Sequence, residues 1–197
     1  MKSPTAASSV VPTSSVKSTD VSTKNAAALP TASVKIQVAS LPIYSDLAGH
    51  WVQQTATKLR YLGILDPDPL FEPKRIVSEQ DISLLYLKIF GTMPAVENLT
   101  LQPDHILSKG EALNLILMGC KTAEASEIDL NQSTPLDTID VPETDHYYTL
   151  IKQSLQYCLI TSGKKLSLAK PITRAELIAI LAKIPRVQKQ IKETFVQ

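Results

Sequence analysis

The chain of 197 residues carries 20 basic and 19 acidic residues, which gives a formal net charge of +1. A chain this close to neutrality has no overall electrostatic attraction to nucleic acid or to an anionic membrane. No apolar run approaches the roughly 18 residues of a membrane-spanning helix. We therefore expect a soluble protein with no transmembrane segment and no nucleic-acid partner, large enough for one core.

The first 41 residues differ in composition from the rest. Residues 1–41 consist mainly of Ser, Thr, Ala, Val and Pro, and contain one acidic residue, Asp20, and no aromatic residue. Such a segment cannot bury enough apolar surface to offset the entropy lost on ordering. We predict a disordered linker. It lacks the apolar stretch of a secretory signal, and the absence of Arg weakens the interpretation as a transit peptide.

Helical periodicity begins after Tyr44. Apolar residues at helical spacing predict a first helix over residues 50–62, ending at Gly63. A similar stretch recurs 96 residues later, where we match His146 to His50. The two histidines are interpreted as hydrogen-bonding groups at a helix start and not as metal ligands, because no third ligand stands nearby.

A helix-start pattern occurs three times. Each copy has a branched apolar residue, then a hydroxyl residue, and a carboxylate three positions after the hydroxyl. The copies are Val77, Ser78 and Asp81; Leu107, Ser108 and Glu111; and Ile172, Thr173 and Glu176. The hydroxyl residues are predicted N-caps and the carboxylates their capping-box partners, of which the shorter Asp81 is expected to be weaker. An apolar stripe follows each start, so three helices are expected to pack together.

The remaining segments are less informative. Asp66-Pro67-Asp68-Pro69 predicts a turn and not a calcium site, because no EF-hand spacing follows. Residues 186–197 form an amphipathic helix that packs on the body, or a tail. Cys158 is expected to be buried on an apolar helical face, and a disulfide to Cys120 is a minor alternative.

Taken in order, these elements resemble the S-layer homology (SLH) family. The first copy reads Tyr44-Ser45-Asp46, His50-Trp51, Leu62-Gly63-Ile64 and Phe71-Glu72-Pro73, followed by the helix start. The third ends in Ile172-Thr173-Arg174-Ala175-Glu176, and the middle copy keeps only its second half. The resemblance covers about residues 42–185, in units of about 42–91, 99–121 and 136–185.

The resemblance implies an all-α fold in which three helix–loop–helix units pack as a pseudo-threefold bundle. It also implies a non-catalytic module that anchors a protein at the bacterial cell surface, to a cell-envelope polysaccharide that is often pyruvylated. The residues that it assigns to ligand binding are Arg174, Lys109, Trp51, Thr173 and Ser108. No cofactor, metal or enzymatic activity is implied, and the sequence contains no catalytic motif.

Departures from the family pattern leave alternatives open. Glu79 stands where the third copy has Arg174 and is expected to repel an anionic sugar. Arg174 is either a ligand contact or a structural salt-bridge partner. Trp51 is either a residue of the core or of the packing between units, or a platform for sugar stacking. The alternative function is a structural or assembly protein that uses the scaffold to bind an envelope protein and has lost the glycan site.

Overall fold

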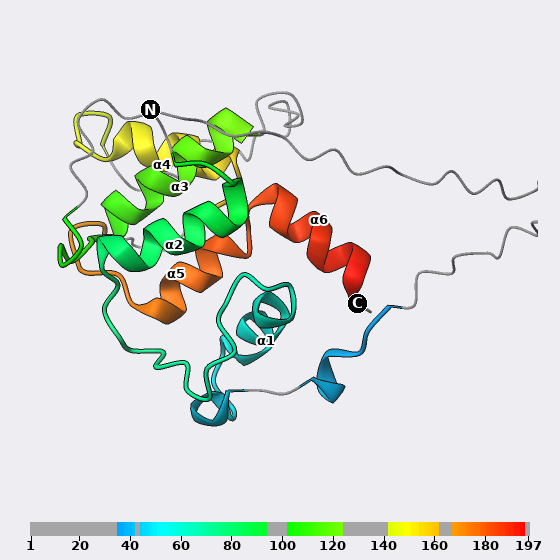
Figure 1. The fold of residues 1–197 in the computed structure, drawn as a ribbon. Helices are drawn as coiled ribbons and strands as arrows, with labels where there is room; N and C mark the ends of the chain where they lie inside the picture. The colour runs from blue at the N-terminus through cyan, green and yellow to red at the C-terminus, as the bar shows by residue number, and fades with distance from the viewer. Residues whose placement is uncertain (1–34, 42–43, 94–101, 124–141, 162–166, 196–197) are drawn as a thin grey trace, which may run out of the picture. The chain divides into compact units, whose positions relative to one another are not determined.

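A computed structural model describes residues 35–41, 44–93, 102–123, 142–161 and 167–195 (Figure 1). This part of the chain is helical and contains no β-strand beyond isolated bridges, which confirms the predicted all-α class. Its elements are the 3-10 turns η1 (Val38–Ser40) and η2 (Ser45–Leu47) and the helices α1 (Gln53–Tyr61), α2 (Glu79–Phe90), α3 (Lys109–Ala123), α4 (Tyr148–Gln156), α5 (Arg174–Leu181) and α6 (Pro185–Thr194). The disorder predicted for residues 1–34 lies outside the described residues.

The helices pack through the apolar stripes seen in the sequence. Helix α3 lies between α2 and α4, and α5 packs on both α1 and α3 (Figure 1). One cluster of buried side chains joins these helices, with Leu59, Ile82, Ile116 and Leu177 nearly inaccessible to solvent. Among the described helices, none combines the length and the apolar character that a membrane crossing requires.

Three extended segments, one before each predicted helix start, meet inside this bundle. Their middle residues Val77, Leu107 and Ile172 are all buried. The Val77 N–H donates to the Ile172 carbonyl at 3.1 Å, and the Ile172 N–H donates to the Leu107 carbonyl at 3.0 Å. The Leu107 N–H donates to the Val77 carbonyl at 3.1 Å. The three hydrogen bonds therefore close into a ring, which we call the central ring.

The central ring brings the starts of α2, α3 and α5 together. The first N–H group of each helix donates to a carbonyl group of a neighbouring segment. The first helical N–H groups donate at 2.8–2.9 Å: Glu79 to His105, Lys109 to Lys170, and Arg174 to Arg75. These bonds satisfy donors that a helix leaves unpaired at its first turn. The starts of the three helices are thereby held by one another and not by solvent.

The reciprocal capping contacts are present at all three starts. In each copy the N–H of the hydroxyl residue donates to the carboxylate, and the N–H of the carboxylate residue donates to the hydroxyl. Asp81 accepts from the Ser78 N–H at 3.0 Å, the same distance at which Glu176 accepts from Thr173. The weaker contact expected of the shorter Asp81 is not seen.

Helix α4 corresponds to α1 and begins 95 residues after it in the chain. The predicted spacing of 96 residues is therefore wrong. Helices α1 and α4 begin at residues 53 and 148 and have equal lengths. The acceptor at the start of α1 is His50 Nδ1, which receives the Val52 N–H at 3.3 Å. The acceptor before α4 is Asp145 Oδ1, which receives the Tyr147 N–H at 2.7 Å. The sequence comparison aligned His50 with His146 because both are histidines. In the folded backbone, the residue at the place that corresponds to His50 is Asp145.

Cys158 also differs from the prediction, because its side chain is exposed and not buried. It follows α4 with φ of 55°, in the left-handed region, at the place that Gly63 with φ of 73° takes after α1. This turn ends the helix and directs the chain back to the buried Leu159. Cys120 is buried in α3, and no disulfide joins it to Cys158, so the alternative of a disulfide is wrong.

Residues 35–41, placed in the linker by composition, belong instead to the packed unit of residues 34–197. The Ile36 N–H donates to the Thr194 carbonyl at 2.9 Å, and Ile36 pairs in parallel with Phe195. Phe195 is buried, and its ring meets Tyr61 of α1 edge to face, with centroids 5.5 Å apart. The predicted C-terminal helix is α6, and it packs on the body through the buried Val187.

The capping contacts predict that Thr173→Ala lowers the free energy of unfolding by about 1 kcal/mol, because it removes the acceptor for the Glu176 N–H. Thr173→Ser keeps the hydroxyl and should stay within about 0.5 kcal/mol of the parent protein. Urea denaturation followed by circular dichroism measures both. Equal stability of the Ala and Ser variants would contradict a capping role.

The positive φ at Cys158 predicts that Cys158→Gly raises the free energy of unfolding by about 0.5–1 kcal/mol, because glycine adopts this conformation without the strain caused by a β-carbon. Gly63→Ala is the matched control. An added β-carbon meets no atom within 4 Å at Gly63, so backbone strain alone should lower its stability. Thermal and urea unfolding test both variants, and a destabilised Cys158→Gly protein would refute the expectation.

Candidate functional site

Two cavities open beside the central ring, and they differ in chemistry. One has a volume of about 320 Å³, and its lining includes Asp68, Arg75, Asp81, Lys88 and Arg174. We call it the Arg174 cavity. The other has a volume of about 560 Å³ between the first turns of α3 and α4, and we call it the α3–α4 cavity. Both volumes are within the range of small-molecule sites.

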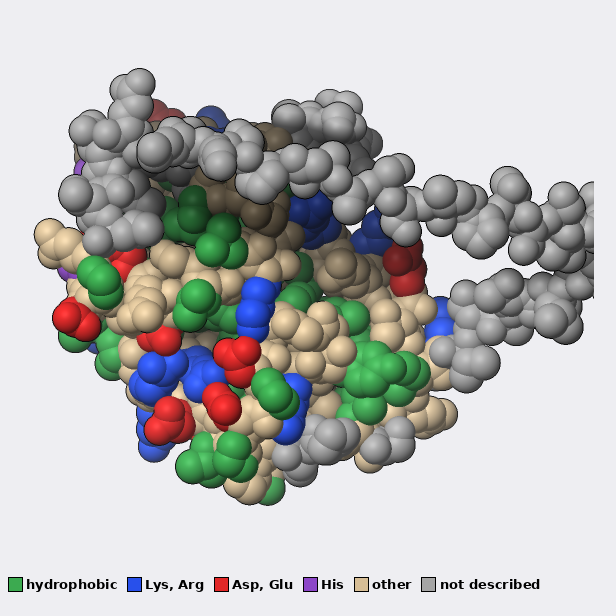
Figure 2. All heavy atoms as spheres, viewed as in Figure 1, with side chains coloured by type: hydrophobic (Ala, Val, Ile, Leu, Met, Phe, Trp, Pro, Cys, Tyr) green, Lys and Arg blue, Asp and Glu red, His purple; other side chains and the backbone are tan. Residues whose placement is uncertain are grey.

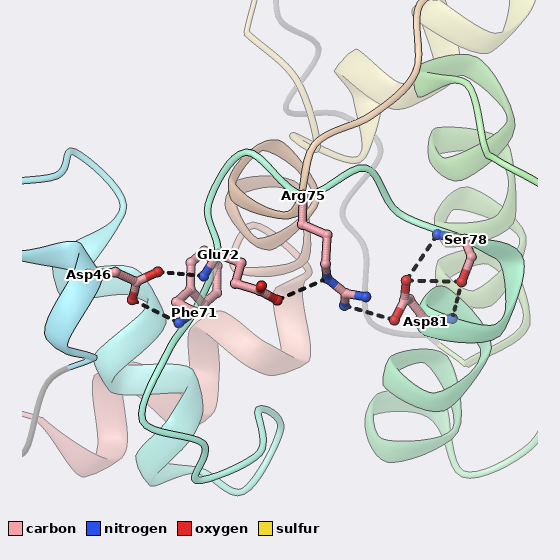
Figure 3. A network of polar contacts seen from close by, with 6 residues as sticks. All are labelled: Asp46, Phe71, Glu72, Arg75, Ser78 and Asp81. Carbon is pink, nitrogen blue, oxygen red and sulfur yellow. Dashed lines mark hydrogen bonds and ion pairs between the residues drawn. The ribbon is translucent and has the colours of Figure 1, made fainter.

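The loop between α1 and α2 forms one wall of the Arg174 cavity. Asp46 holds this loop in place (Figure 3). The Phe71 N–H donates to Asp46 Oδ1 at 2.8 Å, and the Glu72 N–H donates to Oδ2 at 2.6 Å. Phe71 is fully buried, with its ring centroid 5.4 Å from that of Tyr44. A carboxylate 25 residues earlier in the chain therefore sets the position of Phe71 beside the cavity.

Arg75 and Lys88 are cations of this cavity that already have carboxylate partners. Arg75 Nη2 lies 2.9 Å from Asp81 Oδ1, and Arg75 Nε lies 3.7 Å from Glu72 Oε2 (Figure 3). Lys88 Nζ lies 2.7 Å from Asp66 Oδ1. Acidic and basic side chains alternate in the same way on the face drawn in Figure 2, and no large patch of a single sign covers the described residues there.

Arg174 is placed differently from these two cations. It is the first residue of α5, and its guanidinium carbon lies 4.9 Å from the centroid of the Phe71 ring, at cation–π distance. Within the described ranges, no carboxylate lies at ion-pair distance from it. The structural salt bridge considered for Arg174 is therefore not present in this part of the chain, and its N–H donors are available to a ligand in the cavity.

Four carboxyl groups near the central ring have pKa values below their ordinary range: Asp46, Asp81, Glu111 and Glu176. Partial burial by itself would raise each pKa, but hydrogen bonds to the ionised form outweigh it. At Asp81 the donors are the Ser78 N–H, the Arg75 guanidinium and the Ser78 hydroxyl. All four groups are therefore carboxylates at neutral pH, so a cation or a hydroxyl group can pair with them.

The predicted ligand residues do not form a single site. Arg174 lines the smaller cavity and Ser108 lines the larger one, whereas Lys109, Thr173 and Trp51 line neither. Lys109 Nζ lies 2.6 Å from Glu176 Oε1, which ties the start of α3 to that of α5. Thr173 hydrogen-bonds to Glu176 as a cap.

Trp51 is not a core residue, because 65% of its surface is exposed. It precedes α1, and its ring lies beside that of His50, with centroids 5.6 Å apart. The interpretation as a core side chain is therefore wrong. The exposed ring is compatible with the alternative of a stacking surface, at a place outside both cavities.

Glu79 does not act as an exposed anion that would repel a sugar. Only 7% of its surface is exposed, and its Oε2 accepts the Gln102 N–H at 3.0 Å. The sequence showed a negative charge at the place of Arg174, but burial makes Glu79 a structural hydrogen-bond acceptor. The first N–H groups of α2, α3 and α5 donate to carbonyl groups of the protein, so these three groups are not free to bind a ligand carboxylate.

Sequence reasoning missed Phe71 and Arg75 as parts of the candidate site. A signal for Arg75 was available, because a basic residue stands three positions before the hydroxyl residue in every copy: Arg75, His105 and Lys170. Two of them contact the carboxylate of their own copy, Arg75 at Asp81 and His105 at Glu111. No local signal relates Phe71 to Arg174, which is 103 residues later in the chain.

The described ranges hold no group of three His, Cys, Asp or Glu side chains that could bind a metal ion. The side chains that line the two cavities can hydrogen-bond and form ion pairs with a ligand. No model of a known protein family matches the chain, and no curated protein matches it either.

The lowered carboxyl pKa values predict how stability depends on pH. A carboxyl with a depressed folded-state pKa stabilises the protein above its unfolded-state pKa, near 3.8 for Asp and 4.5 for Glu, and this stabilisation is lost as pH falls through the folded-state value. We expect constant stability between pH 7 and about pH 5.5, with a decline below about pH 4.5. Urea titrations at each pH measure it. Glu176→Gln should have a lower free energy of unfolding at pH 7, and that free energy should fall less steeply as the pH is lowered. If it falls as steeply as in the parent protein, Glu176 does not contribute to the acid sensitivity.

Proposed function

We propose that this protein is an SLH-type, non-catalytic module that anchors a protein to a cell-envelope polysaccharide. The observation that carries the proposal is Arg174, whose guanidinium stacks on Phe71 and faces a cavity without a carboxylate partner among the described residues. The N-terminal residues are proposed, from their composition, to be the linker between this module and the rest of the anchored protein.

The central ring supports the architecture implied by the resemblance. Val77, Leu107 and Ile172 occupy the same place in the three copies of the helix start, and each donates one hydrogen bond and accepts one. An arrangement in which three equivalent segments make three equivalent contacts is what pseudo-threefold symmetry requires. We propose that the three copies are units related by such an axis, with the middle unit reduced to its second helix.

The charges of the Arg174 cavity limit the kind of polysaccharide that it suits. Carboxylates and cations both line it, and Arg75 and Lys88 are already paired. A densely charged polyanion would meet Asp68 and Glu72 as well as Arg174. A glycan with isolated acidic groups can instead place one carboxylate on the planar donors of Arg174 and donate its hydroxyl groups to the carboxylates.

One observation favours the alternative of an assembly protein that binds an envelope protein. Helix α4 packs on α3, and α1 packs on α5, but among the described helices α2 packs extensively only on α3. This difference reflects the missing first helix of the middle copy. Leu84 and Leu87 of α2 are 55% and 42% exposed, as expected for an uncovered helix face.

The sequence of α2 argues against a partner on that face. In α3, Gly110 and Leu113 stand two and five positions after the hydroxyl residue of the helix start, and both are buried. The corresponding residues of α2 are Gln80, which is exposed, and Ser83, which is half-buried. Polar side chains at the places that a covering helix would bury indicate adaptation to water. We therefore favour the glycan-binding function.

The proposal predicts that the full-length protein sediments with sacculi purified from its own source organism, and does so less when the secondary polymer has been removed. Arg174→Ala should lower the affinity about tenfold, because it removes a charged hydrogen-bond donor worth about 1.5 kcal/mol. Quantitative co-sedimentation over a range of sacculus concentrations measures the change.

Lys189→Ala, at an exposed cation of α6, is the matched control and should bind like the parent protein. Circular dichroism should show the same helicity for both variants. Equal recovery of the parent protein from intact and stripped sacculi, or recovery from neither, would refute the proposal. Capture of an envelope protein with no dependence on the polymer would favour the assembly function instead.

A further inference from the structure

Uncharged hydroxyl and amide side chains make up most of the polar lining of the α3–α4 cavity, which also includes Glu111 and His146. Its lining includes Ser108, Asn114, Tyr147, Thr149 and Gln153, and none of its described lining residues is a Lys or an Arg. Amide and hydroxyl side chains can each donate and accept hydrogen bonds. The cavity therefore offers both kinds of partner that a hydroxyl group of a ligand requires.

Tyr147 supplies an aromatic surface at this cavity. Its ring lies against the first turn of α3 at Gly110, where an added β-carbon would come within 2.7 Å of Tyr147 Cε1. The absence of a side chain at Gly110 thus allows this close approach. The ring is half-buried, and in the described part of the chain its hydroxyl has no hydrogen-bond partner. Aromatic rings with one apolar face and one polar end are suited to ligands of mixed polarity.

Among the described residues that line this cavity, Glu111 is the acidic one. It is ionised at neutral pH, because the Ser108 N–H and hydroxyl and the His105 imidazole hold its pKa below the ordinary value despite partial desolvation. The lining residue Gln153 is contacted by Lys121, whose Nζ donates to Gln153 Oε1 at 2.7 Å. A carboxylate repels an anionic ligand and accepts hydrogen bonds from hydroxyl groups, so the electrostatics favour a neutral ligand.

We infer that the α3–α4 cavity binds an uncharged, hydroxyl-rich sugar ring, which stacks on Tyr147 and hydrogen-bonds to Asn114 and Glu111. This inference rests on the proposed glycan-binding function and deepens it. The two cavities then take chemically different parts of one polysaccharide: an acidic group at Arg174, and a neutral ring between α3 and α4. The neutral subsite is independent of the charge at Arg174.

The test is a titration of the isotope-labelled full-length protein, followed by two-dimensional ¹H–¹⁵N NMR. N-acetylglucosamine is the neutral probe, and N-acetylmuramic acid is the matched probe that carries an additional carboxylate. We expect N-acetylglucosamine to shift the amide signals of Gly110, Asn114 and Thr149, with dissociation constants in the millimolar range that is typical of one sugar ring. The same signals should shift at least threefold less with N-acetylmuramic acid.

Asn114→Ala should weaken this binding at least threefold without loss of fold, because Asn114 is exposed on α3 and Ala has a high helix propensity. Tyr147→Phe keeps the ring and should retain most of the binding, whereas Tyr147→Leu should lose it. The inference is overturned if neither probe shifts these signals, if N-acetylmuramic acid shifts them as strongly, or if Asn114→Ala binds like the parent protein.

Arg174→Ala separates this inference from the proposed function. If both are right, the variant sediments poorly with sacculi but still responds to N-acetylglucosamine at Gly110 and Asn114. A variant that keeps its affinity for sacculi would remove the proposed role of Arg174. A parent protein that binds sacculi through Arg174 but does not respond to N-acetylglucosamine would remove only the neutral subsite.

Discussion

The central ring of hydrogen bonds is the constraint on which the rest of this structure depends. Val77, Leu107 and Ile172 are buried, and a buried backbone group without a partner destabilises the fold by about 1–3 kcal/mol. Each of the three residues uses its N–H on one neighbour and its carbonyl on the other, so no segment can shift without breaking two hydrogen bonds. The ring thereby fixes where α2, α3 and α5 begin, and the first N–H of each helix is satisfied by a carbonyl from a neighbouring segment.

This constraint determines where ligand chemistry can occur. A helix N-terminus is an anion site when its N–H groups face solvent, but here the first N–H group of α2, α3 and α5 already donates to a carbonyl group of the protein. Any ligand must therefore be held by side chains at the rim of the ring. Arg174 projects from one helix start onto Phe71, and Tyr147 lies against another at Gly110. The two cavities differ in charge because different segments line them, and together they suit a ligand with both acidic and neutral parts.

The sequence predicted the local features well and the long-range ones poorly. The three capping boxes were predictable, because a hydroxyl residue and a carboxylate three positions later need only each other and the intervening backbone. The displacement of 96 residues was wrong because it followed the identity of the histidines, whereas the acceptor at the second helix start is Asp145. The exposure of Trp51 and the burial of Glu79 depend on which segments cover them. From residue type alone, a tryptophan is expected to be buried and a glutamate to be exposed.

The sequence by itself determined the helical class and the three helix starts, because propensity, capping and apolar spacing act over a few residues. Only the tertiary structure decided which charges are available. Lys109 and Arg174 occupy the same place in their copies, but Lys109 is paired with Glu176 across two segments, and Arg174 is stacked on an aromatic ring. Such pairings join residues 67 and 103 positions apart in the chain. No local pattern encodes them, because they exist only after the central ring has brought the segments together.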